Sequence, residues 1–171
     1  MSHALARLRR TPFASALLIA ALGASALLSA CGGGGDDGPK ANPSSSGNSA
    51  AYAGKWLGDC IVEGTNSYRT QLVFTATSGT TLQVATTYYD YTGTVCGGTA
   101  RLSSGTGQVS IVGTKTASGV VVDKVNITMS GSTMEKDILY SDGRKMVTGD
   151  SSADSAGYPN ALDNSFAFHL Q

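Results

Sequence analysis

From residue 55 onward, apolar and polar residues alternate in short runs that Gly, Ser, Asn and Asp separate. In residues 67–76, for example, Thr70, Leu72 and Phe74 share one face of an extended chain. Alternation with a period of two is typical of β-strands with one buried face, and no long segment shows a helical period. The pattern predicts about eight or nine strands, over residues 55–62, 67–76, 81–91, 99–103, 108–116, 120–129, 136–141, 144–148 and 165–170.

The residues between these runs indicate how the strands connect. Ser118-Gly119 and Asp142-Gly143 each separate two alternating runs, which is a hairpin signal, and Ser78-Gly79 indicates another turn. Consecutive hairpins favour an antiparallel up-and-down β-barrel of about eight strands, because closure removes exposed strand edges. We therefore expect one all-β domain over residues 52–171, with a β-sandwich as the alternative. Residues 150–164 are predicted to form an irregular surface excursion.

The first thirty residues have the composition of an export signal. Arg7, Arg9 and Arg10 precede an apolar run over residues 13–30 that is diluted by Ala, Ser and Gly. A secretory signal peptide consists of a positively charged N-terminal region, an apolar stretch, and small residues at the end of that stretch. The alternative is a transmembrane helix, which needs about 20 strongly apolar residues. We predict a signal peptide over residues 1–30.

The end of this run, Leu28-Ser29-Ala30-Cys31, resembles the lipobox of bacterial lipoproteins. The resemblance implies that Cys31 is acylated with three chains and becomes the first mature residue. It also implies an outer-membrane location, because Gly32 replaces the aspartate that favours inner-membrane retention. The alternative is an unmodified cysteine after an ordinary cleavage site. Residues 31–51 are rich in Gly and Ser and predict a flexible tether with a mean reach of roughly 25 Å.

Charge and cysteine content narrow the possible partners. Removal of residues 1–30 leaves nine basic and twelve acidic residues, a formal net charge of −3, which does not favour a nucleic-acid partner. With Cys31 assigned to lipid, Cys60 and Cys96 remain, and two cysteines in an exported domain usually pair. We predict a structural disulfide; a redox pair is the alternative, although such thiols usually stand in Cys-x-x-Cys.

The chain offers few residues for catalysis. His169 is the single histidine after residue 30, so neither a serine triad nor a zinc site is indicated. It alternates with Phe168 and Leu170 and is expected on the outer face of the last strand. Asp90, Asp123 and Asp137 fall in separate predicted strands, and no motif pairs two carboxylates. We therefore predict a protein that is not an enzyme and has no metal or cofactor.

The start of the first predicted strand, Gly54-Lys55-Trp56, resembles the Gly-x-Trp signature of the lipocalins and related calycin families. The resemblance implies that Trp56, the single tryptophan, plugs one end of the barrel. Closure would then place Phe166 and Phe168 of the last strand beside it. The chain departs from the family pattern in its shorter length, the lack of a C-terminal helix and the lack of an assured arginine over Trp56.

Two functions are compatible with these features. In the first, a periplasmic barrel binds or carries a small apolar ligand, with Tyr88, Phe74 and Leu82 as candidate ligand contacts. In the second, the barrel is filled, and a structural or interaction lipoprotein docks envelope proteins through its loops and outer face, where Tyr89 and Tyr91 would meet a partner. The simplest explanation of the tyrosines is that aromatic residues favour strands.

The Cys31→Ser variant tests the anchor. We expect it to be released from membranes or mislocalised, because each buried methylene of the acyl chains contributes about 0.8 kcal/mol to membrane binding. Membrane fractionation of the variant beside the wild type measures this. Equal partitioning of the two proteins into membranes would show that Cys31 is not the anchor.

Overall fold

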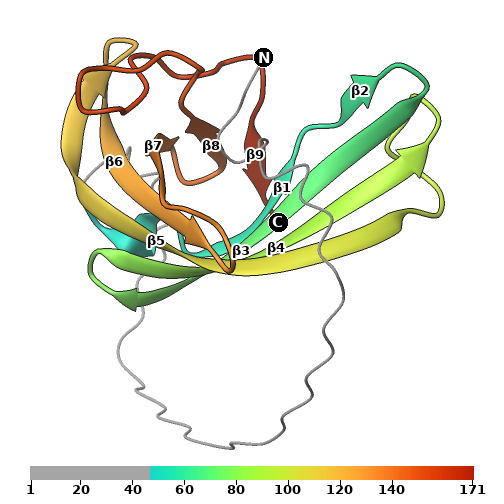
Figure 1. Cartoon of the computed structure of the whole chain (residues 1–171), viewed down its shortest axis with the longest axis horizontal. Helices are drawn as coiled ribbons and strands as arrows, with labels where there is room; N and C mark the ends of the chain where they lie inside the picture. Colours follow the sequence, from blue (N-terminus) through green and yellow to red (C-terminus); the bar gives the residue numbers. More distant parts are fainter. Residues whose placement is uncertain (1–46) are drawn as a thin grey trace, which may run out of the picture.

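The computed structural model describes residues 47–171. Its elements are η1 (Ser49–Ala51), β1 (Gly54–Gly58), β2 (Ile61–Glu63), β3 (Asn66–Ser78), β4 (Thr81–Thr92), β5 (Arg101–Ala117), β6 (Val120–Met129), β7 (Glu135–Ser141), β8 (Lys145–Thr148) and β9 (Phe168–Leu170). Every named strand pair is antiparallel. The predicted all-β class is confirmed (Figure 1).

Strand β1 closes the sheet into a ring. Each strand from β3 to β9 pairs with the next one along the chain, and β1 pairs with both ends of this series. Within β1, Trp56 lies opposite Leu72 of β3 on one side and opposite Leu170 of β9 on the other. The result is a closed eight-stranded antiparallel barrel in which β2 is an additional strand. The up-and-down barrel is thus confirmed, and the sandwich alternative is wrong because both edges of β1 are paired.

The inward-facing side chains of the barrel form one continuous core. The alternation predicted for residues 67–76 is present, with Leu72 and Phe74 almost fully buried. The members of this core are Tyr52, Trp56, Leu72, Phe74, Leu82, Val84, Val109, Ile111, Val125, Ile127, Met129, Leu139, Met146, Phe166 and Phe168. Interiors of proteins are close-packed, and an eight-stranded barrel is narrow enough for side chains to fill.

The two hairpin signals are confirmed. Ser118 and Gly119 join β5 to β6 with φ angles of 51° and 79°, so both residues have the left-handed backbone of a tight hairpin turn. Asp142 and Gly143 join β7 to β8, and the φ of Gly143 is 88°. The Asp142 carboxylate accepts hydrogen bonds from the backbone N–H groups of Arg144 and Lys145, which holds this second turn.

The first predicted strand, over residues 55–62, is wrong as a single element. It divides into β1 and β2 at Asp59, whose N–H donates to the Ala167 carbonyl at 2.9 Å and whose carboxylate accepts from the Ala167 N–H at 2.9 Å. A Cβ on the preceding Gly58 would lie 2.7 Å from the Phe166 ring, so only glycine fits there. These local contacts with the last segment interrupt the strand.

The two predicted strands over residues 99–103 and 108–116 form a single strand, β5. The Gly-rich stretch between them suggested a break, but it stays extended. A Cβ on Gly107 would lie 2.6 Å from the Met129 sulfur, and one on Gly105 would lie 3.6 Å from the Met129 methyl group. The glycines therefore make room for Met129 of β6 on the inner face, which is a packing role and not a turn.

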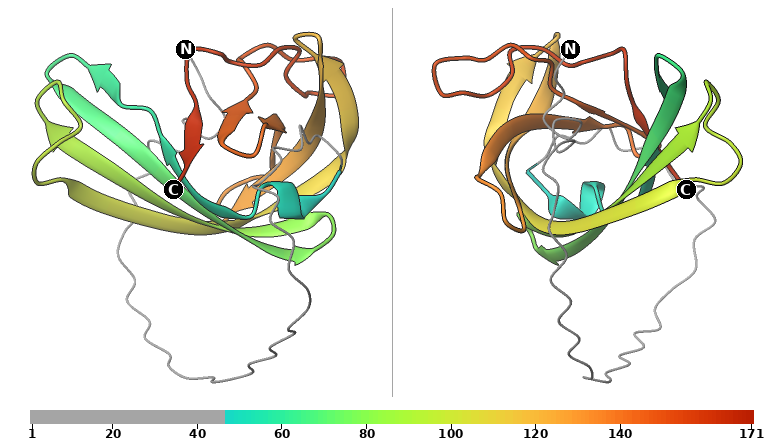
Figure 2. Two further views of the ribbon diagram at one scale, coloured as in Figure 1. Left: turned by 180° about the vertical axis from the view of Figure 1, so that it is seen from behind. Right: turned by 45° about the vertical axis from the view of Figure 1, so that its right-hand side comes forward.

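The folded domain begins earlier than the predicted boundary at residue 52. The N–H of Ser49 in η1 donates to the Gly79 carbonyl at 2.9 Å, and its hydroxyl donates to the Ser78 carbonyl. The Asn48 side chain caps the helix by accepting from the Ala50 N–H at 3.0 Å. Because these residues bond to the β3–β4 turn, at least residues 48–51 of the predicted tether belong to the domain. In Figure 2, η1 lies within the outline of the barrel.

Residues 150–164, predicted as a surface excursion, also bury apolar side chains. Tyr158 and Leu162 pack against outward-facing residues of the barrel in a second core, whose members are Ala117, Val122, Ile138, Val147, Tyr158, Leu162 and Ala167. Lys115 fixes the segment through hydrogen bonds to Asp154 (2.6 Å) and to the Pro159 carbonyl (2.9 Å). We call residues 150–164 the cover segment, because they cover part of the outer face of the barrel.

Strands β3, β4 and β5 are longer than their neighbours and continue past the ring. Their ends, with β2, project from the barrel on the right of Figure 1. This extension consists of β2 and residues 66–70, 88–92 and 101–105, which remain paired from β2 to β5. β6 stops at Met129, opposite Gly107, so among the described strands none pairs with residues 101–105 on that side.

Replacement of Trp56 tests its predicted plug role. Trp56 is 1% exposed, so we expect blue-shifted fluorescence that quenchers barely reach. Truncation to alanine should lower the free energy of unfolding by about 3–5 kcal/mol, because it removes a large buried side chain. The Val112→Ala variant is the control, because Val112 is 46% exposed and should change stability little. Red-shifted, freely quenched emission, together with an unchanged melting temperature of Trp56→Ala, would contradict the role.

Candidate functional site

The barrel interior was the first candidate site, and the structure fills it with side chains. Phe74 and Leu82 are 3% and 0% exposed and belong to the interior core. Tyr88 is partly buried on the same face of β4, in the part of the strand that belongs to the extension. The three residues therefore lie on one continuous inner surface, but two of them pack against protein. Their contact with a ligand stays a prediction.

Trp56 and Tyr52 together occupy part of this interior. The Trp56 Nε1 donates a hydrogen bond to the Tyr52 carbonyl at 2.7 Å, and Phe166 and Phe168 belong to the same core, as closure of the barrel predicted. Tyr52 reaches across the barrel: its hydroxyl donates to Asp123 of β6 at 2.7 Å and lies 3.2 Å from the Leu139 carbonyl of β7. The sequence pattern did not identify Tyr52, which precedes the first strand.

Asp123 is a buried acid that faces the interior. It is 0% exposed and accepts hydrogen bonds from the Tyr52 hydroxyl and from the Gly47 N–H at 2.9 Å. Burial raises the pKa of Asp123 and also raises that of Tyr52. The alternation of Asp123 with Val125 and Ile127 was a sequence signal for this position, because all three share one face of β6.

A second buried acid, Asp137 of β7, lacks a partner for one oxygen. Its Oδ1 accepts from the N–H groups of Ile138 (2.7 Å) and Gly149 (2.9 Å), whereas Oδ2 is buried without a hydrogen bond to a described residue. Burial raises the pKa of Asp137 to about 7, with smaller upward contributions from the charges of Glu135 and Asp150. Asp137 is not hydrogen-bonded to Asp123, so the structure does not join these two carboxylates.

The predicted disulfide between Cys60 and Cys96 is confirmed, with Cα atoms 5.7 Å apart. It connects the segment before β2 to the loop between β4 and β5. The Cys96 sulfur lies 3.3 Å from the Tyr68 carbonyl. Because β2 has only three residues, this covalent link holds the outer strand of the extension in place.

The outer face of the extension carries Tyr89 and Tyr91, as predicted for residues that would face a partner. Inward positions of β4 are even-numbered, so these odd-numbered tyrosines lie on the opposite face. Leu102 lies opposite Tyr89 and is 61% exposed, and Val62 of β2 is 49% exposed. Arg69, opposite Tyr89 on β3, makes no ion pair with a described residue. This surface combines aromatic, aliphatic and Arg side chains.

The edge of β5 within the extension offers unpaired backbone groups. The Thr106 carbonyl accepts from the Ser130 N–H at 2.9 Å, so even-numbered residues of β5 direct their backbone groups away from β4. By the alternation of a strand, Leu102 and Ser104 direct their N–H and C=O groups to the same side. Among the described residues, no strand lies there to bond with them.

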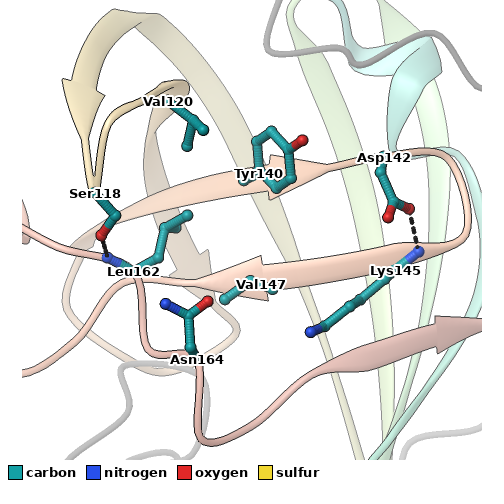
Figure 3. Close-up of a pocket in the computed structure, with 8 residues that line it drawn as sticks. All are labelled: Ser118, Val120, Tyr140, Asp142, Lys145, Val147, Leu162 and Asn164. Carbon is teal, nitrogen blue, oxygen red and sulfur yellow. Dashed lines mark hydrogen bonds between the residues drawn. The ribbon is translucent and has the colours of Figure 1, made fainter.

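A cleft of about 260 Å³ lies on the outer side of β7 and β8, between the β5–β6 turn and the cover segment (Figure 3). Val120, Val147 and Leu162 supply its apolar surface. Its other lining residues are Ser118, Tyr140, Asp142, Lys145 and Asn164. The Leu162 N–H donates to the Ser118 hydroxyl oxygen at 2.9 Å, which joins the two sides of the cleft. Sequence reasoning missed this site, because its residues come from separate segments.

His169 lies on β9 and is exposed, as expected for the outer face of the last strand. Its Nε2 is 3.0 Å from an Asp59 carboxylate oxygen. A histidine–carboxylate pair needs a nucleophile for triad chemistry. Within residues 47–171, the side-chain hydrogen bond of His169 is to Asp59, which supplies neither a hydroxyl nor a thiol.

Comparisons with protein families, with curated proteins and with solved structures gave no match. Within residues 47–171, no helix has the length and apolar character needed to cross a membrane. The same part of the chain holds no group of three or more His, Cys, Asp or Glu side chains arranged for a metal ion. Cys31 and the predicted signal peptide lie outside the described residues.

The raised pKa of Asp137 predicts a pH-dependent stability. Between about pH 4 and pH 7 the folded chain binds more protons at this site than the unfolded chain. The free energy of unfolding should therefore fall as the pH rises across this range, by roughly 2–4 kcal/mol, and level off above it. Asp123, whose pKa is also raised, acts in the same direction.

Denaturant unfolding at a series of pH values measures this dependence. Asp137→Asn should flatten the slope between pH 4 and pH 7, because the amide does not ionise. Asp90→Asn, at an exposed position of β4, is the matched control and should keep the slope. A slope that is the same in Asp137→Asn as in the wild type would exclude Asp137 as its origin.

Proposed function

We propose that this chain is a non-enzymatic lipoprotein of the cell envelope that acts by binding another protein, with a barrel filled by its own side chains. The filled interior is the observation that carries this proposal. Trp56, Phe74, Leu82 and Phe168 are each 3% exposed or less and belong to one core. A ligand-carrying barrel of eight strands would need these side chains to leave space inside it.

The leader supports the envelope location. Its lipobox-like end at Cys31 and the shortened Gly/Ser-rich stretch after it would hold the domain at a mean distance of roughly 20 Å from an outer-membrane surface. A tethered domain meets other envelope proteins at high local concentration. An interaction of modest affinity is then sufficient for function.

The extension is the surface that we assign to the partner. Its outer face presents Tyr89, Tyr91 and Leu102, and tyrosine is enriched in protein interfaces. Next to the Leu102 side chain, the open edge of β5 presents the backbone N–H and C=O groups of Leu102 and Ser104, which no described strand pairs with. A strand edge with free N–H and C=O groups accepts an extended segment of another chain by β-augmentation. We infer that the partner contributes such a segment.

The charges of the extension indicate the character of this segment. Arg69 lies on the outer face, whereas the exposed Arg101 lies opposite Asp90 on the inner face, and neither arginine forms an ion pair with a described residue. The outer face of the extension carries Arg69 and no acidic side chain, since Glu63 and Asp90 lie on the inner face. An extended segment with an acidic residue is therefore the complementary partner.

Site-specific photo-crosslinking in the envelope of the native host tests the proposal. A photoreactive residue at position 102 should form a crosslink to one protein, and mass spectrometry should locate it in an extended segment with an acidic residue. The same residue at position 112, which is also exposed but lies beside paired strands, is the matched control. Equal crosslinking from both positions, or none from position 102, would contradict the proposal.

Two further measurements separate this function from ligand transport. The Ser104→Pro variant removes an N–H that faces the open edge and not β4, so the barrel should stay folded by circular dichroism while the crosslink is lost.

Native mass spectrometry of the protein from its own host should give the mass of the acylated chain alone. A retained small molecule released by denaturation would support the ligand-carrying barrel instead.

A further inference from the structure

The outer cleft of Figure 3 has the parts of a binding site that is separate from the extension. We propose that it binds a small monocarboxylate with an apolar body, held by Lys145 and Asn164 over an apolar floor. The inference does not depend on the proposed protein partner, because it involves β7, β8 and the cover segment.

The floor of the cleft can hold an apolar group. Val147 is 4% exposed and Leu162 is 9% exposed, and the cleft lining adds Val120 and the ring of Tyr140. These side chains come from the β5–β6 turn, from β7, from β8 and from the cover segment. The volume of about 260 Å³ suits a ligand of about ten non-hydrogen atoms, near the lower limit of ligand pockets.

The walls of the cleft are held by hydrogen bonds. The Asp163 N–H donates to the Thr148 carbonyl at 2.9 Å, and Gly149 forms a β-bridge with Leu162. At the opposite side, the Asp142 carboxylate accepts from the N–H groups of Arg144 (2.8 Å) and Lys145 (2.7 Å). The site is therefore formed before a ligand binds, which reduces the entropy lost on binding.

Three polar side chains of the cleft retain their hydrogen-bonding capacity. The Tyr140 hydroxyl, the Lys145 ammonium and the Asn164 amide form no hydrogen bond with another residue of the described part of the chain. In Figure 3 the Lys145 side chain extends away from Asp142 and toward the side of Val147 and Asn164. The Lys145 ammonium and the Asn164 amide would satisfy a carboxylate, for which Lys145 supplies the opposite charge.

Asp142 limits where the acid group of the ligand can lie. Its pKa is lowered, chiefly by the hydrogen bond from the Lys145 N–H, so it is ionised at neutral pH and repels an anion. A ligand carboxylate is therefore directed to the Lys145–Asn164 side, and the apolar body lies on Val147 and Leu162. This arrangement favours a monocarboxylate over a dicarboxylate.

Titration of the full mature chain with phenylacetate, followed by backbone amide NMR, tests the site. We expect saturable shifts at Tyr140, Val147 and Leu162, and at least fivefold weaker binding of the neutral phenylacetamide. Lys145→Met should weaken phenylacetate binding by about fivefold, since an exposed ion pair contributes up to about 1 kcal/mol. Lys55→Met is the matched control, because it removes an exposed lysine of β1 and should leave binding unchanged.

Several results would overturn the proposal. Shifts confined to other parts of the domain, or no saturable shifts, would show that the cleft does not bind the probe. Equal binding of phenylacetamide would remove the role of the carboxylate. Equal weakening by Lys145→Met and Lys55→Met would show a general charge effect. Preserved amide spectra of both variants establish that the fold is intact, so each comparison measures binding.

Discussion

The pairing of β1 with both β3 and β9 is the constraint on which the rest of the structure depends. Trp56 stands at this junction, opposite Leu72 on one side and Leu170 on the other. Without it, the meander from β3 to β9 would be an open sheet with free edges at β3 and β9, and proteins avoid a long exposed edge such as that of the 13-residue β3. Closure by a strand of only five residues also fixes a narrow interior, and Tyr52, Trp56, Phe166 and Phe168 help to fill it.

The short length of β1 has a second consequence. β3, β4 and β5 have 13, 12 and 17 residues, so they cannot all end inside the ring that β1, β8 and β9 close. The surplus length becomes the extension, with an additional strand and a disulfide on one side and an open edge on the other. The core and the candidate interaction surface are therefore formed by different parts of the same three strands, β3, β4 and β5.

Buried polar groups lie at the two places where irregular segments meet the barrel. Asp123 accepts hydrogen bonds from Gly47 and Tyr52 before β1, and Asp137 accepts one from Gly149 at the start of the connection to the cover segment. A buried acid is unfavourable unless hydrogen bonds compensate for the loss of water. These contacts specify where the segments attach, and the cover segment in turn forms one wall of the outer cleft.

Local sequence patterns were sufficient to predict the elements that depend on neighbouring residues. Alternation predicted the strands and their inward faces, Ser118-Gly119 and Asp142-Gly143 predicted the hairpins, and Cys60 and Cys96 predicted the disulfide, because each signal acts over a short span or through one covalent bond. Three features could not be predicted in this way: Gly105 and Gly107 lie within a strand, Tyr52 crosses the barrel to Asp123, and residues 118 and 164 line one cleft. These features depend on which strands are neighbours and in what register, and closure of the sheet sets both through contacts between residues far apart in the chain.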